Sequence, residues 1–203
     1  MKKHNFLRKI LNYIAFGIAS ILSPYVATAV FIMIISYSYS KDLSQFLPWM
    51  LSFFVFALVI PAIYVLWLME NKLVKDIHIA DRAARIKPFW VSGISALAGA
   101  ILLWQLHATS QVAVVATIYA INALGIALIT QFWKISVHMA LLSSIATMSV
   151  IIFGERFWWL YLLLIPLAWS RIYRQRHTPA QAAAGAMLTF VLTALGFWYF
   201  GYL

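Results

Sequence analysis

The sequence predicts an all-α protein, a polytopic membrane bundle of six to seven transmembrane helices. Of its 203 residues, 65% are hydrophobic and only 10% are charged, and a water-soluble fold needs more polar surface than this composition leaves. Apolar runs close to the roughly 20 residues that a membrane-spanning helix needs recur along the chain. The charged residues fall in short segments between these runs. We therefore expect one integral membrane domain over residues 1–203, without a soluble second domain.

Seven apolar segments are candidate spans. The first, 10–38, follows a basic N-terminal segment, 1–9, and is longer than the apolar core of a signal peptide, so we expect it to be retained. The sixth is short and contains Pro166, so we expect it either to tilt into a thinned region or to be extended by Arg171 to Arg174. The other expected spans are 47–69, 89–107, 111–130, 136–153 and, after the sixth at 157–170, 179–202.

The basic residues predict the orientation. Seven crossings place the N-terminus and the 70–88, 131–135 and 171–178 segments on one side, with thirteen of the fifteen Lys and Arg residues. Only Lys41 and Arg156 fall on the other side. The positive-inside rule then makes the first side cytoplasmic in a multi-pass protein of the cell membrane. The net charge of +10 is thus explained without a nucleic-acid partner.

Three polar segments on that side need a further explanation, because ionisable residues near the membrane usually mark function. They are the 70–88 loop, the 134–138 segment and the 170–181 segment. Guanidinium and ammonium groups from all three suit phosphate oxygens. The candidate phosphate-binding residues are Arg171, Ser136, Arg82, Arg85, Lys87 and Lys134.

Two histidines complete this candidate site. His138 and His177 each begin an expected span, where a helix N-terminus favours anions. One imidazole can attack phosphorus while the other donates a proton to the leaving oxygen. Thr178 and Pro179 are typical of the first residues of a helix. Gln181, four residues after His177, then lies within reach of its ring and can orient it.

The pattern resembles the type 2 phosphatidic acid phosphatase family. Ser170 and Arg171, followed after five residues by His177, resemble its third signature, Ser-Arg-x5-His-x3-Asp. Ser136-Val-His138 is similar to its second signature, Pro-Ser-Gly-His. Lys87-Pro88 is similar to the end of its first, Lys-x6-Arg-Pro. The resemblance implies that His177 forms a phosphohistidine, that His138 is the general acid, and that Ser136, Arg171 and the first-signature cations bind phosphate, with Ser170 and Gln181 supporting.

The chain also departs from these signatures. Ala80 stands where the first-signature Lys would fall, and Lys87 replaces its Arg. Ile135 and Val137 replace the Pro and Gly of the second signature. Gln181 replaces the Asp that supports the nucleophile, so the imidazole has an amide partner without negative charge. Arg82 and Arg85 are candidates to replace the missing Lys.

Other intramembrane enzymes do not fit the residue inventory. The five acidic residues cannot supply the two carboxylate clusters that magnesium-dependent prenyl or alcohol phosphotransferases need. The chain lacks cysteine and a plausible metal-ligand set, and it lacks the Gly-x-Ser-x-Gly turn of a serine hydrolase. We expect neither a metal nor a cofactor. The predicted function is hydrolysis of a lipid phosphate or a prenyl or lipid pyrophosphate.

Alternatives remain open at each motif. The 70–88 loop also fits an ordinary basic loop with an interfacial stretch, Asp76 and Asp81 pairing with nearby cations. His138 also fits a histidine satisfied within the bundle, and 170–181 a basic turn. For the whole chain, the alternative is a catalytically silent protein that binds or transports an anionic lipid. Membrane lipids are expected partners, and the sequence leaves the oligomeric state open.

Overall fold

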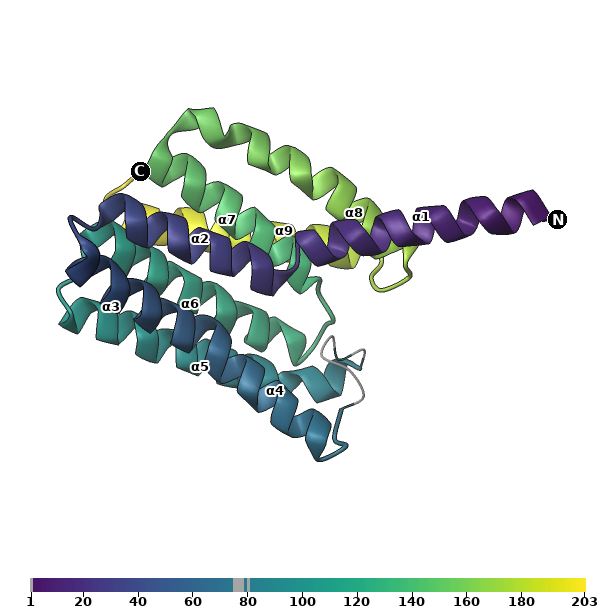
Figure 1. The fold of residues 1–203 in the computed structure, drawn as a ribbon, viewed down its shortest axis with the longest axis horizontal. Coiled ribbons are helices and arrows are strands. Elements are labelled where there is room, and N and C mark those ends of the chain that lie inside the picture. Colours follow the sequence, from purple (N-terminus) through teal and green to yellow (C-terminus); the bar gives the residue numbers. More distant parts are fainter. Residues whose placement is uncertain (1, 75–78, 80) are drawn as a thin grey trace.

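The chain folds into a bundle of roughly parallel and antiparallel helices (Figure 1). The structure, a computed structural model, describes residues 2–74, 79 and 81–203, with side chains from Phe6 onward. The described residues form helices and no strands. The α-helices are α1 Lys2–Ile21, α2 Pro24–Tyr39, α3 Leu43–Phe54, α4 Ile60–Glu70, α5 Arg82–Gln105, α6 Ser110–Thr130, α7 Val137–Phe153, α8 Leu164–Tyr173 and α9 Pro179–Tyr199.

The helices traverse the bundle back and forth, and the two termini lie at opposite ends of the molecule (Figure 1). A π-helix, η1 (Val55–Val59), joins α3 to α4, and a 3₁₀ helix, η2 (Glu155–Leu163), precedes α8. The most extensive packing is of α5 on α6 and of α7 on α9. The first residues of α5, α7 and α9 lie at the end nearer the N-terminus (Figure 1). The described parts of the three polar segments therefore lie at the same end of the bundle.

Among the described residues, five segments are long and apolar enough to cross a membrane, which indicates a membrane protein. They are Phe6–Tyr39, Leu43–Glu70, Arg82–Gln105, Ser110–Thr130 and Pro179–Tyr199. The expected span 136–153 corresponds to α7, a shorter apolar helix. The expected span 157–170 corresponds to η2 and α8. Because a 3₁₀ helix rises about 2.0 Å per residue, η2 and α8 together reach about 33 Å, comparable to the hydrocarbon core.

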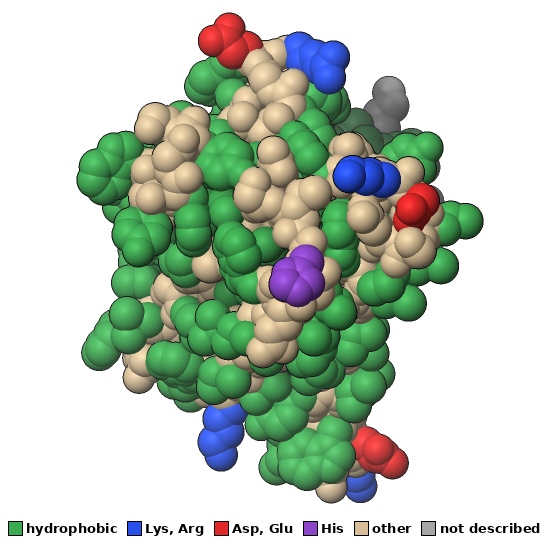
Figure 2. Space-filling view, turned by 90° about the vertical axis from the view of Figure 1, so that its left-hand side faces the viewer, with side chains coloured by type: hydrophobic (Ala, Val, Ile, Leu, Met, Phe, Trp, Pro, Cys, Tyr) green, Lys and Arg blue, Asp and Glu red, His purple; other side chains and the backbone are tan. Residues whose placement is uncertain are grey.

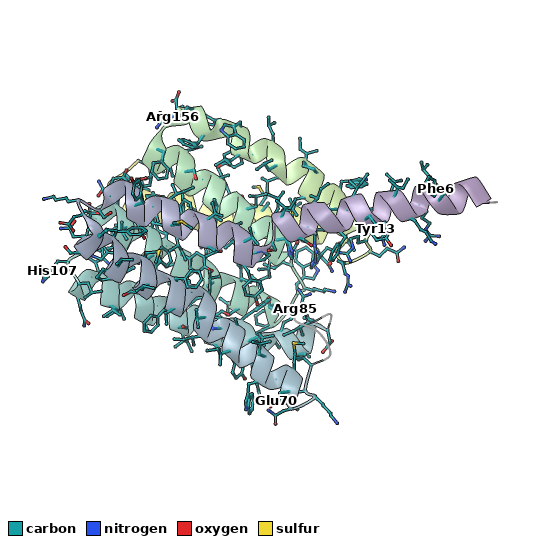
Figure 3. The ribbon with its side chains drawn as sticks, viewed as in Figure 1. Phe6, Tyr13, Glu70, Arg85, His107 and Arg156 are labelled. Atoms are coloured by element: carbon teal, nitrogen blue, oxygen red, sulfur yellow. The ribbon has the colours of Figure 1, made fainter. Side chains whose placement is uncertain are left out.

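The first expected span, 10–38, is divided in the structure. Ser23 has an extended backbone, and its hydroxyl accepts a hydrogen bond from Val26 N at 3.3 Å. Pro24 starts α2, at a helical position where its missing N–H costs nothing. The helix therefore ends at Ile21 and restarts at Pro24. The first part, α1, projects beyond the bundle, with Phe6 and Tyr13 along the projecting part (Figure 3).

The face opposite the projecting helix is mainly hydrophobic, with isolated charged side chains (Figure 2). This uneven distribution fits the sequence, which assigns thirteen of the fifteen basic residues to the other end. The buried core lies between α2, α5, α6, α7 and α9, and includes Ile32, Leu103, Ile118, Met148 and Phe197. It holds together the helices whose ends carry the three motifs.

Candidate functional site

The second motif, residues 134–138, is held directly against α9, the helix in which the third motif, residues 170–181, ends. Ser136 N donates a hydrogen bond to Gln181 O at 3.1 Å, so the segment before α7 is tied to the first turn of α9. Gly185, one turn further along α9, permits this approach. A Cβ on Gly185 would lie 2.5 Å from Ser136 O and 3.3 Å from Ser136 N. Both contacts are with backbone, which cannot move aside as a flexible side chain can.

We therefore expect Gly185→Ala to destabilise the protein. The added methyl group forces the 134–138 segment away from α9, and overpacking of this kind costs about 1–3 kcal/mol. The measurement is thermal unfolding in detergent, where the variant should melt several degrees below the native protein. Gly17→Ala is the matched control, because a Cβ at Gly17 meets nothing within 4 Å. Equal melting temperatures of the native protein and Gly185→Ala would contradict the close contact between Gly185 and the backbone of Ser136.

The spacing of the third motif follows from the way α8 ends and α9 begins. Arg176 N donates to Arg171 O at 3.0 Å, and Gln175 adopts a left-handed backbone with φ of 54°. This is the usual closing turn of an α-helix, although glycine is the more common residue there. Thr178 then caps α9. The reversal returns the chain on itself, so that Arg171 and His177 line one cavity.

Gln181 orients the ring of His177. The predicted cap of α9 is confirmed as a capping box, in which Gln181 N donates to Thr178 Oγ1 and Thr178 N donates to Gln181 Oε1, each at 3.2 Å. The bond from the backbone N–H identifies Oε1 as the amide atom on this side. His177 Nδ1 lies 3.3 Å from the same Oε1. An oxygen can only accept, so Nδ1 carries the proton and Nε2 keeps its lone pair.

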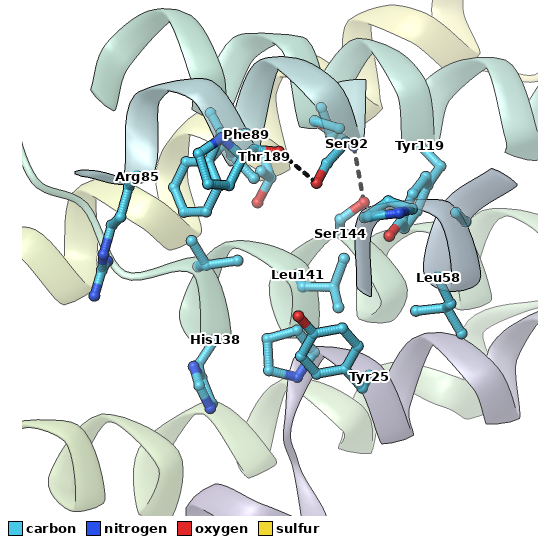
Figure 4. A pocket seen from close by; sticks show the side chains of 18 of the residues that line it. Tyr25, Leu58, Arg85, Phe89, Ser92, Tyr119, His138, Leu141, Ser144 and Thr189 are labelled. Atoms are coloured by element: carbon cyan, nitrogen blue, oxygen red, sulfur yellow. Dashed lines mark hydrogen bonds between the residues drawn. The ribbon is translucent and has the colours of Figure 1, made fainter. Parts of the chain in front are cut away.

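Four of the predicted site residues line one cavity of about 160 Å³: His138, His177, Arg85 and Arg171. They come from α7, the α8–α9 loop, α5 and α8, respectively. In Figure 4, Arg85 and His138 lie toward one end of this cavity, and Tyr119 and Leu58 toward the other. None of the described residues that line the cavity is acidic. One end of the cavity is thus both cationic and supplied with two imidazoles.

The cations near this end act on one another through their charges. The pKa of Lys134 is lowered, first by burial and then by the charges of Arg85, Arg176 and Arg171, while Asp81 opposes the shift. The same environment lowers the pKa of His177 to about 3: burial contributes most, followed by Arg171, Arg85 and Lys134. His177 is therefore neutral at physiological pH. A concentration of positive charge this close to a neutral imidazole favours binding of an anion.

The lowered pKa of His177 predicts a loss of stability in acid. An unfolded histidine takes up its proton near pH 6.5, whereas folded His177 does so only near pH 3. Between these values the unfolded chain binds the extra proton, so stability falls as pH falls. We expect the melting temperature to drop between pH 7 and pH 4.5, and to drop less in His177→Asn. Parallel pH profiles for the two proteins would contradict the assignment.

Two buried polar atoms of the motifs have no protein partner among the described residues, and of their two residues Arg171 lines the cavity whereas Ser136 does not. Ser136 is completely buried and Arg171 is 4% exposed. Within the described part of the chain, neither Ser136 Oγ nor Arg171 Nε has a hydrogen-bond partner. Buried polar atoms are normally paired, because leaving one unpaired is costly. Arg85 is also buried, and its Nε donates to Ile79 O at 2.5 Å.

The structure gives other positions to the remaining predicted residues. Arg82 donates to the backbone oxygens of Thr130, at 3.1 Å, and Gln131, so it closes the end of α6. Lys87 is exposed. Neither lines the cavity, and neither does Lys134, which contributes through its charge. The first motif thus reaches the cavity through Arg85 rather than through Arg82 or Lys87.

Ser170 is also outside the cavity lining. It is completely buried, and its Oγ donates to Ala15 O at 2.6 Å, which attaches α8 to α1. Asp81 caps α5 by accepting from Ala84 N at 3.1 Å. Lys75, Asp76, His78 and Ala80 of the predicted first-motif loop lie outside the described residues. The side chains of Lys2 and Lys3, expected to orient the N-terminus, also lie outside them.

Sequence reasoning missed the polar residues deeper in the cavity. Tyr25, Ser92, Tyr119, Asn122 and Ser144 also line it, together with apolar side chains from α4 and α6. Asn122 is the clearest omission, since an amide in the middle of an apolar span is unusual and usually has a function. Its position on the cavity-facing side of α6 depends on the rotation of that helix, which sequence alone does not define.

No protein family model, curated protein or solved structure matches the chain. The assignment of a function therefore rests on the site itself.

Proposed function

We propose that the protein is an integral membrane phosphatase that hydrolyses a lipid phosphate or pyrophosphate without a metal ion, through a phosphohistidine at His177. The observation that carries the proposal is the single cavity that His138, His177, Arg85 and Arg171 line. Three separate sequence motifs contribute to it. Apolar side chains of the bundle continue the cavity beyond the cations, as a lipid substrate requires.

In the proposed reaction, Nε2 of His177 attacks phosphorus and forms a P–N bond while the P–O bond to the lipid breaks. His138 gives a proton to the departing lipid oxygen. Water then attacks the phosphohistidine with His138 as base, the P–N bond breaks, and inorganic phosphate leaves. Arg171 and Arg85 hold the non-bridging oxygens and stabilise the charge of the transferring group.

Two features support His177 as the nucleophile. Its low pKa keeps the imidazole neutral, so that a lone pair is available at physiological pH. Its contact with Gln181 Oε1 assigns the proton to Nδ1 and leaves the lone pair on Nε2. Gln181 thus supplies the orientation that the carboxylate provides in the phosphatase family that the motifs resemble, but no negative charge. We therefore expect a slower enzyme than one with a carboxylate there.

The charge distribution supports a topology for this enzyme. The basic N-terminal segment and the three motif segments are predicted to be cytoplasmic by the positive-inside rule. The substrate would then bind with its phosphate at that membrane surface and its chain between the helices.

Phosphate release tests the proposal. Purified native protein and His177→Asn are compared on lipid phosphates and a prenyl pyrophosphate in detergent, with EDTA present. We expect release by the native protein and a loss of at least about 10³-fold in the variant, the scale of removing a catalytic nucleophile. Arg156→Ala, whose guanidinium lies over Phe157 at the far end, is the control and should keep the activity. Equal phosphate release by the two proteins, or no release by either, overturns the proposed phosphatase activity.

A silent lipid-binding protein is the second candidate, and the same cationic cavity supports it. It predicts binding of an anionic lipid that survives His177→Asn and is lost when the two cavity-lining arginines, Arg171 and Arg85, are both replaced by alanine. Undiminished binding by this double variant would exclude the second candidate.

A further inference from the structure

We propose that Asn122 forms a second, neutral subsite that recognises a hydroxyl on the lipid backbone of the substrate. This inference rests on the proposed function, since it extends the phosphate site along the same cavity. Asn122 is 3% exposed and lies within α6, eight residues before the end of this helix at Thr130. It lines the cavity with Ser144 of α7.

The hydrogen bonding of Asn122 leaves one end of its amide unused. Nδ2 donates to Ser144 Oγ and to Thr193 Oγ1, each at 2.8 Å, and these two hydroxyls are 3.1 Å apart. The carboxamide is thereby held in place from two other helices. Oδ1, in contrast, has no hydrogen-bond partner among the described residues, although it is buried. A positioned acceptor of this kind calls for a donor from the ligand.

The neighbouring polar groups do not supply that donor. Ser92 Oγ donates to Pro88 O at 2.9 Å, and Thr189 Oγ1 donates to Ala140 O at 2.5 Å. Both hydroxyls therefore donate to helix carbonyls and not to Asn122 Oδ1. Figure 4 shows Ser92, Ser144 and Thr189 in the wall of the cavity. A plain alkyl or prenyl chain would bury Asn122 Oδ1 without any partner. A ligand hydroxyl would complete its hydrogen bonding.

The depth of this subsite identifies which part of the lipid reaches it. Ser144 follows His138 by six residues on α7, which is about 9 Å along the helix axis. A 2-hydroxyl of a glycerol phosphate lies four bonds from phosphorus, which is about 5 Å at about 1.2 Å per bond. Its hydrogen bond to Oδ1 adds about 3 Å, so its total reach of about 8 Å is close to this depth. The hydroxyl therefore belongs to the lipid backbone near the phosphate and not to the tail. The chemical class is a hydroxylated lipid phosphate, as opposed to a prenyl phosphate or pyrophosphate.

The test is a binding comparison that does not depend on catalysis. His177→Asn protein in detergent, which keeps the cavity but lacks the nucleophile, is titrated with 1-oleoylglycerol 3-phosphate and with the matching propanediol ester, which lacks only the 2-hydroxyl. We expect the hydroxylated lipid to bind about tenfold more tightly, the scale of one buried hydrogen bond. Asn122→Leu in the same background should make the two affinities equal, because it weakens the binding of the hydroxylated lipid alone.

Ser144→Ala is the matched control, since it removes a partner of Nδ2 and leaves Oδ1 in the cavity, so the preference should persist. Equal affinities in the His177→Asn protein would overturn the subsite even if Asn122→Leu failed to fold, and would indicate that water satisfies Oδ1. A preference unchanged by Asn122→Leu would overturn it as well. Failure of the proposed function is recognised separately, because the native protein would then release no phosphate from either lipid.

Discussion

Replacing Arg171 with alanine is expected to lower kcat/KM for phosphate release by about 10³-fold, the range found when a charged group that stabilises a transferring phosphoryl group is removed. Arg171 is buried, lines the cavity beside His177, and has an Nε without a partner among the described residues. Arg171→Lys should recover only part of the loss, because an ammonium group keeps the charge but not the two-pronged contact with phosphate oxygens.

The same substitution separates two effects of Arg171. Its charge is the largest electrostatic contribution that lowers the pKa of His177, second only to burial. Arg171→Ala should therefore raise the pKa of His177 even as it lowers activity. Arg174→Ala is the control from the same turn, since Arg174 lies over the ring of Phe16, 4.9 Å from its centroid. Activity within a few-fold of native in Arg171→Ala would contradict its role in phosphate binding.

Gln181 is the site of the second large effect. Gln181→Met keeps the length of the side chain but removes the acceptor of Nδ1, so the imidazole loses control of its tautomer. Loss of the correct tautomer in a comparable histidine site costs about 10⁴-fold, and we expect turnover by this variant to slow by roughly a hundredfold or more. Gln181→Glu should act in the opposite direction, because glutamate preserves the capping box and places a negative charge beside Nδ1.

A carboxylate at this distance raises the pKa of a histidine by about 1–3 units. We expect Gln181→Glu to raise the pKa of His177, followed by NMR of the imidazole, and to speed turnover about tenfold. Thr178→Ala controls for the helix cap, since it removes the bond from Gln181 N but leaves Oε1 in contact with the ring. A native rate in Gln181→Met would show that the amide does not orient the nucleophile.

Local patterns in the sequence predicted the helical bundle and the grouping of its polar loops. Thr178, Pro179 and Gln181 identified the start of α9, because capping depends on neighbouring residues alone. The spacing from Arg171 to His177 likewise follows from one helix end and the next helix start. The break between Ile21 and Pro24 was missed, although Ser23 and Pro24 are typical helix-start residues.

The choice among the first-motif cations needed the structure. Arg82, Arg85 and Lys87 lie within two turns of the start of α5, and sequence alone does not define how that helix is rotated against α6 and α7. The structure turns Arg85 into the cavity, uses Arg82 at the end of α6 and leaves Lys87 exposed. Asn122 was missed for the same reason, because its hydrogen bonds to Ser144 and Thr193 depend on how three helices pack together.

Trapping of the covalent intermediate tests the central proposal most directly. The native protein is mixed with a ³²P-labelled lipid phosphate and quenched with alkaline detergent, which preserves phosphohistidine, and the labelled peptide is sequenced by mass spectrometry. We predict label on His177, absent from His177→Asn and accumulating in His138→Gln if that variant still attacks but cannot complete hydrolysis. Steady release of phosphate by the native protein with no label on His177, or with label on another residue, would contradict the account.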